Sequence, residues 1–260
     1  MSQQEQIGLC RLCMQKRELR NSHIFPKFIY KDFVSDLNAG GQFVSLEEGR
    51  KTNKQIKRFW YCEECEQRFG NAENSAKKML AAVTRSEPVW YGNRLLPFCV
   101  SVTLRCLEYE FRKKSFPKRG PLCDARRTWR EYLLGRRSSP APRSQHAFLI
   151  VDDKEMYKGA GTVTSQDEGL ILCQVGPLYI AGIFDKRLLT SNDIRIWDQS
   201  RVDPNGGTLR PVREWRVGTE VTSDFARLLA IHEREACMRV LDQTRANTRR
   251  KARSPNRSSM

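Results

Sequence analysis

Apolar positions in the first third of the chain follow helical spacing in some segments and strand spacing in others. After Pro26, a residue suited to the first turn of a helix, apolar side chains recur every three or four positions until residues 38–41. The apolar segments 43–46 and 56–61 predict two short strands joined by a polar, charged loop. A second helical period begins at Glu66. The pattern therefore predicts a helix, a pair of strands and a second helix.

A helix-breaking sequence at residues 86–88 separates this part from the rest of the chain. Two further helices are predicted after it, an amphipathic one at 98–114 and a second at 124–134. The composition of residues 135–143 is typical of an exposed linker.

Strand patterns follow the linker. Four apolar segments predict an antiparallel sheet: 146–151, 170–175, 178–184 and 193–197. A long helix at 223–241 follows them, and the basic residues 246–260 have too few apolar side chains to fold. The predicted fold is α+β, with an N-terminal module at 1–85, a basic α+β region at 86–245 and a disordered tail at 246–260.

Two Cys-x-x-Cys pairs are the most specific chemical signal. Cys10 and Cys13 form the first pair, and Cys62 and Cys65 form the second. Four thiolates in two close pairs suit the tetrahedral coordination of a structural Zn²⁺ ion. Unrelated thiol pairs and a redox-active pair are the alternatives. The remaining cysteines show no pairing and are interpreted as small buried hydrophobic residues: Cys99, Cys106, Cys123, Cys173 and Cys237.

The charge of the chain indicates which class of partner it binds. The formal net charge is +16, and such an excess favours nucleic acid, DNA or RNA, because each neutralised phosphate releases a counterion. The alternatives are a basic surface kept for solubility and a surface that binds an acidic protein or a second copy of the chain. Cationic candidates for contact with nucleic acid lie in the two predicted helices and around them: Arg112, Lys113, Lys114, Lys118, Arg119, Arg126, Arg127, Arg130, Arg136 and Arg137.

Several classes of protein do not fit the sequence. No apolar segment is long enough to span a membrane and the N-terminus is not signal-like, so we expect a cytoplasmic protein without a membrane partner. Glycine-rich phosphate loops, dinucleotide fingerprints and Ser-His-Asp patterns are missing. The aromatic residues Trp60, Tyr61, Trp90 and Tyr91 are interpreted as core or sheet residues, with base stacking as the alternative.

The N-terminal motifs together resemble a known family. A Cys-x-x-Cys pair, a Ser-His-Ile-x-Pro-Lys-Phe segment at residues 22–28 and a Cys-x-x-Cys-Glu helix resemble the HNH, or ββα-metal, nuclease superfamily. The similarity is to an uncharacterised bacterial branch with cysteines flanking the motif. It covers about the first third of the chain and implies a treble-clef zinc module in a bacterial or phage protein.

The resemblance also implies roles for three residues. In active members of the superfamily a first histidine takes a proton from the attacking water, and a later ligand helps to hold a divalent metal on the phosphate. His23 matches the first position and Glu66 stands at the second, with Glu73 further along the same helix. Carboxylates suit Mg²⁺ or Mn²⁺, so the resemblance implies a metal-dependent endonuclease.

Each of these residues has a simpler interpretation. His23 could cap the following helix, bond to a backbone carbonyl or replace a cysteine as a zinc ligand. Glu66 could be an acid favoured by the positive N-terminus of a helix, and Glu73 could be a solvated helix residue. A zinc protein that binds nucleic acid without cleaving it is therefore the alternative function.

Overall fold

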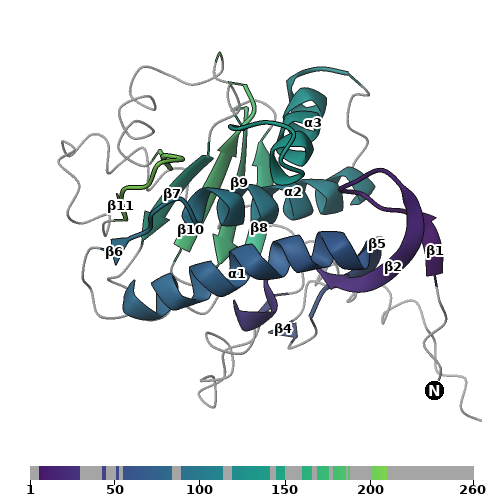
Figure 1. Ribbon diagram of the computed structural model, residues 1–260, viewed down its shortest axis with the longest axis horizontal. Coiled ribbons are helices and arrows are strands. Elements are labelled where there is room, and N and C mark those ends of the chain that lie inside the picture. Colours follow the sequence, from purple (N-terminus) through teal and green to yellow (C-terminus); the bar gives the residue numbers. More distant parts are fainter. Residues whose placement is uncertain are drawn as a thin grey trace, which may run out of the picture.

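The computed structural model describes residues 6–29, 43–44, 51–52, 55–83, 89–113, 119–140, 145–149, 160–165, 169–175, 178–185, 187 and 201–209. These residues form three α-helices and several small antiparallel sheets (Figure 1). The predicted mixed α+β architecture is confirmed. The predicted strand at 193–197, the long helix at 223–241 and the tail at 246–260 lie outside the described residues.

The first sheet consists of β1 (Gln6–Leu9), β2 (Lys16–His23) and β5 (Lys57–Tyr61), in the order β1-β2-β5. Both pairings are antiparallel, and the β2–β5 register shifts between Arg20 and Asn21. The prediction missed β2 because this strand is mostly polar, and only two of its side chains are buried. Its neighbours on both sides stabilise it through backbone hydrogen bonds rather than through an apolar face.

The predicted partners of the short strands in this region are wrong. Residues 43–46 were expected to pair with residues 56–61. Instead β3 (Phe43–Val44) pairs with β4 (Lys51–Thr52), and β5 pairs with β2. Strands β3 and β4 are separated only by a short connection, which favours their local pairing. Strand β5 pairs with β2, although a much longer segment of chain separates these two strands. The helix predicted from Pro26 begins with a helical turn at residues 27–29, and its remainder lies outside the described residues.

Helix α1 (Glu63–Val83) follows β5 directly and confirms the helix predicted after the second cysteine pair. Its first turn carries Glu63, Glu64 and Glu66, where negative charge is favoured by the helix dipole. Phe69 and Leu80 on one side of the helix are buried. This side packs against β2 and the second helix.

Helix α2 (Leu95–Lys113) is the centre of the molecule. It lies between α1 and α3 (Pro121–Leu133) and covers one face of the larger sheet (Figure 1). The helix predicted at 98–114 is confirmed, but its predicted amphipathic character is wrong, because every residue from 98 to 110 is buried. Neighbours on several sides cover the helix, so its charged residues are enclosed together with its apolar ones.

The larger sheet contains strands β7 (Gln145–Leu149), β8 (Ala160–Ser165), β9 (Leu170–Val175) and β10 (Leu178–Ile183). Its order is β7-β10-β9-β8, and all neighbours are antiparallel. Three of the strands confirm the prediction, whereas β8 was not predicted. A separate strand pair joins β6 (Val89–Trp90) to β11 (Thr208–Leu209).

Aromatic side chains join the N-terminal part to α2. The Phe28 and Phe98 rings lie 6.2 Å apart between centroids, and the Trp60 and Tyr109 rings lie 6.5 Å apart. The division at residue 85 stays a prediction. Within the described ranges, no helix is both long enough and apolar enough to cross a membrane.

A close contact between α3 and the sheet gives a prediction for stability. A Cβ atom on Gly182 would lie 2.7 Å from the Trp129 ring, which is fully buried. We expect Gly182→Ala to lower the free energy of unfolding by about 1–3 kcal/mol through overpacking. The matched control is Gly70→Ala in α1, where the added Cβ would have no atom within 4 Å apart from the neighbouring backbone of its own helix, and helix propensity favours alanine by about 1 kcal/mol. Thermal unfolding measures both, and equal effects would contradict this packing.

Candidate metal centre

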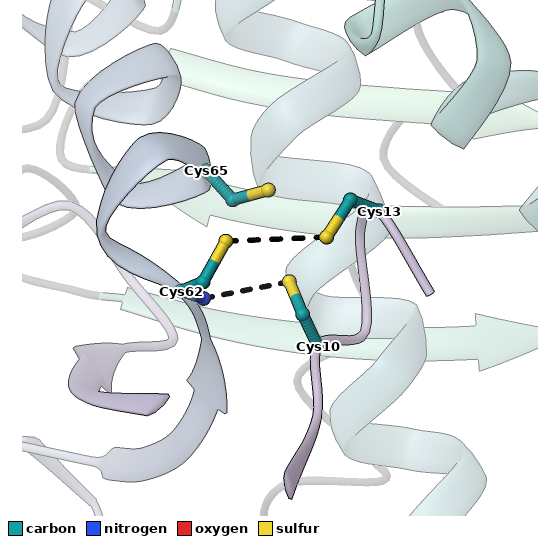
Figure 2. A group of neighbouring side chains, drawn as sticks. All are labelled: Cys10, Cys13, Cys62 and Cys65. Atoms are coloured by element: carbon teal, nitrogen blue, oxygen red, sulfur yellow. Dashed lines mark hydrogen bonds between the residues drawn. The ribbon is translucent and has the colours of Figure 1, made fainter. Parts of the chain in front are cut away.

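The two cysteine pairs meet between the β1–β2 connection and the start of α1. Cys10 and Cys13 come from that connection, Cys62 directly precedes α1, and Cys65 lies in its first turn. Figure 2 shows the four side chains converging, and their sulfur atoms all lie within 4.8 Å of one another. Three of the four residues are buried, and Cys13 is partly exposed.

Backbone hydrogen bonds hold the first pair in a tight turn. The Met14 amide donates to the Cys10 carbonyl at 2.9 Å, and Met14 itself has a positive φ of 60°. The Arg11 amide donates to the Trp60 carbonyl at 2.8 Å, which joins this turn to β5. The Cys62 amide donates to Cys10 Sγ at 3.4 Å (Figure 2). The sulfurs are therefore positioned by the backbone of both segments.

The electrostatics of the cluster favour an ionised sulfur. Hydrogen bonding with Cys65 lowers the pKa of Cys10 to about 4, and nearby backbone amides add to this effect. The same hydrogen bond raises the pKa of Cys65, and burial raises the pKa of Cys13.

The donor set fits a structural zinc ion. Zinc–sulfur bonds of about 2.3 Å in a tetrahedron require sulfur–sulfur distances of about 3.8 Å. Cys13 Sγ and Cys62 Sγ are 3.9 Å apart (Figure 2), which is much longer than a disulfide bond of about 2.05 Å. All four are free cysteines. The predicted ligands are thus brought together, and the cluster is consistent with a zinc-binding module.

The other cysteines in the described part of the chain fit the prediction of small buried residues with one exception. Cys99, Cys106 and Cys173 are buried, and Cys123 is partly exposed on α3. Cys237 lies outside the described residues.

His23 is the last residue of β2. Its Nε2 atom hydrogen-bonds Gln55 Oε1 at 2.5 Å, and its backbone carbonyl accepts a bond from Arg105 Nη1 at 3.2 Å. Burial lowers the pKa of His23, whereas the hydrogen bond to Gln55 acts in the opposite direction. The imidazole is therefore neutral at pH 7.

Glu66 and Glu73 face a buried arginine. Glu73 Oε1 lies 2.8 Å from Arg105 Nη1. Burial raises the pKa of Glu66, while the Ser22 hydroxyl and Arg105 oppose this shift. One Glu66 oxygen, Oε1, is buried without a hydrogen-bond partner. Both acids are thus close to a cation and are not simply solvated helix residues.

Arg105 on α2 lies inside the molecule. Its side chain is buried, donates from Nε to the Ser101 carbonyl and lies over the Phe69 ring. Burial alone would lower the pKa of Arg105, but Glu73 and Glu66 raise it above its ordinary value. Arg105 is therefore an internal cation beside Glu66, Glu73 and the His23 carbonyl, and we call these four residues the polar cluster.

The histidine and the two glutamates do not form a ready metal site. Among the residues that the structure describes, the four cysteines are the only group of three or more potential ligands whose donor atoms converge. Arg105 supplies the positive charge next to Glu73 that a divalent metal would otherwise supply.

The arginines predicted to bind nucleic acid fall into different environments. Arg127 pairs with Asp124 at 3.0 Å, and Arg137 pairs with Glu131 at 3.6 Å. Three others are exposed: Arg112, Arg119 and Arg136. The remaining two arginines, Arg126 and Arg130, bond to the buried Glu108. The side chain of Lys113 and the whole of Lys114 and Lys118 lie outside the described part of the chain.

Trp60, Tyr61 and Tyr91 are buried, as predicted. Trp90 lies in β6 but is 68% exposed, and its ring stacks on Tyr91 with centroids 6.5 Å apart.

Sequence reasoning missed Glu108 and its third partner, Arg11. Glu108 stands directly between the apolar residues Leu107 and Tyr109, which is a weak local signal of burial, but nothing nearby in the sequence indicates its arginine partners. Comparison of the chain with protein-family models, curated proteins and solved structures finds no match. The function of this chain is therefore inferred from the site itself.

Proposed function

We propose that this protein is a zinc-stabilised nucleic-acid-binding protein with an HNH-like, treble-clef module. The observation that carries the proposal is the convergence of the cysteines of the β1–β2 connection with those at the start of α1. In this arrangement two antiparallel strands, β2 and β5, precede the helix that supplies the second cysteine pair. One zinc ion would be held by the four thiolates and would stabilise the fold without taking part in chemistry.

The charge of the chain supports nucleic acid as the partner. The formal net charge is +16, and Arg112, Arg119 and Arg136 are exposed around α2 and α3. Exposed arginines contact phosphates without reading sequence, so we expect binding of low sequence selectivity that weakens steeply with salt.

Metal-dependent phosphodiester hydrolysis is the second candidate function. The HNH resemblance suggests it, and the three residues lie near one another: Arg105 bonds the backbone carbonyl of His23 and the Glu73 carboxylate, and Glu66 raises the pKa of the same arginine. With Gln55 Oε1 as acceptor, Nε2 of His23 carries the proton and Nδ1 is the basic nitrogen, as a general base requires. A catalytic Mg²⁺ or Mn²⁺ ion would have to draw Glu73 away from Arg105.

One experiment separates the two candidates. Zinc-loaded wild type, His23→Ala and Glu73→Gln are incubated with plasmid DNA and structured RNA in Mg²⁺, in Mn²⁺ or without a divalent ion. The matched control is Glu64→Gln, an exposed acid of the same helix paired with Arg17. The leading proposal expects salt-sensitive binding by all four proteins and no cleavage.

Two other outcomes would contradict the leading proposal. Metal-dependent nicking that falls by about 10²–10⁴-fold in His23→Ala and persists in Glu64→Gln would establish the endonuclease. Absence of binding by wild type at low salt would overturn the nucleic-acid proposal and favour an acidic protein partner.

A further inference from the structure

Glu108 on α2 is a buried carboxylate shared by three arginines. Its side chain has no exposed surface. Oε1 accepts from Arg126 Nε and Arg130 Nη2, each at 2.5 Å. Oε2 accepts from Arg126 Nη2 at 2.6 Å and from Arg11 Nη1 at 3.1 Å. We call Arg11, Arg126 and Arg130 the arginine cluster.

The arginine cluster holds more positive charge than its carboxylate neutralises. Among the described residues, Glu108 is the only acid with which these three side chains pair. Burial lowers the pKa of Arg130, and the charge of Arg126 lowers it further despite the bond to Glu108. Partly buried cations without their own counterions are costly, so a bound anion would stabilise the cluster.

The cluster is open to solvent and has unused donors. The Arg11 and Arg126 side chains are 31% and 27% exposed. Each guanidinium has five N–H groups, and Arg11 donates one of them to Glu108. The Arg130 Nε atom is buried without a hydrogen-bond partner. Because Arg11 and Arg126 donate to the same carboxylate oxygen, their guanidinium groups lie close enough to contact one ligand together.

The zinc module fixes one member of the cluster. Arg11 lies between Cys10 and Cys13, and its guanidinium is centred 4.2 Å from the Trp60 ring centroid. Arg126 likewise lies over the Phe111 ring, at 4.9 Å. Stacking holds each planar group in place before any ligand binds, and planar guanidinium forks match the oxygens of phosphate.

We propose that Arg11, Arg126 and Arg130 form a phosphate-binding site for the backbone of a nucleic acid, with Glu108 holding the three guanidinium groups in place. The phosphate chemistry follows from the cluster itself, whereas nucleic acid as its source rests on the proposed function. The site joins the turn between two zinc ligands to α3, so both parts of the chain contact the same bound strand.

The test measures how binding of a short fluorescein-labelled DNA duplex to the full-length protein depends on salt. Arg126→Gln and Arg11→Gln are each expected to reduce the slope of log K against log salt by about 0.9, the loss of one phosphate contact. The matched control is Arg20→Gln on β2, a residue outside the predicted nucleic-acid contacts, whose partly exposed side chain pairs with Glu18 and Glu63. Its slope should equal that of wild type. Glu108 keeps two arginine partners in each cluster variant, so folding should persist, and thermal unfolding checks this.

A second measurement separates the site from the source of its ligand. Inorganic phosphate, at ionic strength matched with chloride, should raise the unfolding temperature of wild type and Arg20→Gln but not of Arg126→Gln. If phosphate stabilises in this way while wild type does not bind the duplex, the nucleic-acid source and the proposed function are overturned and the phosphate site stands. Equal slopes for Arg126→Gln and Arg20→Gln, without a phosphate effect, would overturn the site.

Discussion

Removing zinc from the four-cysteine cluster is expected to unfold the N-terminal part of this protein. Structural zinc sites contribute apparent binding free energies of about 10–16 kcal/mol in zinc-finger peptides, and that energy is folding energy. Here the ion would join two segments that are otherwise connected through backbone contacts such as the bond from Arg11 to Trp60. We therefore expect chelation to lower the unfolding temperature by roughly 10 °C or more.

Calorimetry with metal analysis of the same samples measures this effect. Cys62→Ser should lose zinc and show the same instability without a chelator. Cys123→Ser is the matched control, because Cys123 lies on α3 outside the cluster. Zinc loss without a change in unfolding temperature would contradict the structural role of the ion.

Replacing Glu108 by glutamine is expected to have the second largest effect. The substitution keeps the shape of the side chain but removes the charge that three arginines share, and it places an amide donor against other donors. Breaking a buried ion pair by neutralising one partner costs about 3–5 kcal/mol. Chemical denaturation of Glu108→Gln and wild type measures the difference.

The matched control for this substitution is Glu131→Gln. Glu131 is a partly exposed acid on α3 that pairs with Arg137 at 3.6 Å, and surface pairs contribute about 0–1 kcal/mol. A similar small effect for both variants would show that Glu108 is not the counterion of the arginine cluster.

The metal centre could be predicted from the sequence because short segments of the chain specify each of its parts. Each Cys-x-x-Cys pair specifies a turn that presents two sulfurs, and the helix after Cys62 follows from helical spacing of apolar residues. Strands β9 and β10 were predicted for a similar reason, since their apolar sequences match burial on both faces.

The missed features depend on tertiary packing. Strand β2 is polar and forms because β1 and β5 pair with it, which no pattern within residues 16–23 indicates. Arg105 and Glu108 look like solvated helix residues in sequence, yet neighbouring elements enclose the whole circumference of α2. The partners that satisfy them, Glu73 and the arginine cluster, come from distant positions. Buried charge networks of this kind require the fold to be known first.

Arg105 links the residues at which the HNH resemblance implies catalysis. Its contacts with the His23 carbonyl and Glu73 hold β2 and α1 together at the positions where the HNH resemblance implies catalysis. Our leading proposal therefore assigns binding to the protein, and hydrolysis stays the second candidate.

The most direct test of the central claim is zinc K-edge X-ray absorption on the full-length protein with its native metal. We expect one zinc ion per chain with four sulfur ligands at about 2.3 Å. A shell that contains nitrogen would place a histidine such as His23 among the ligands and contradict the four-cysteine assignment. Absence of bound zinc would contradict a fold stabilised by zinc.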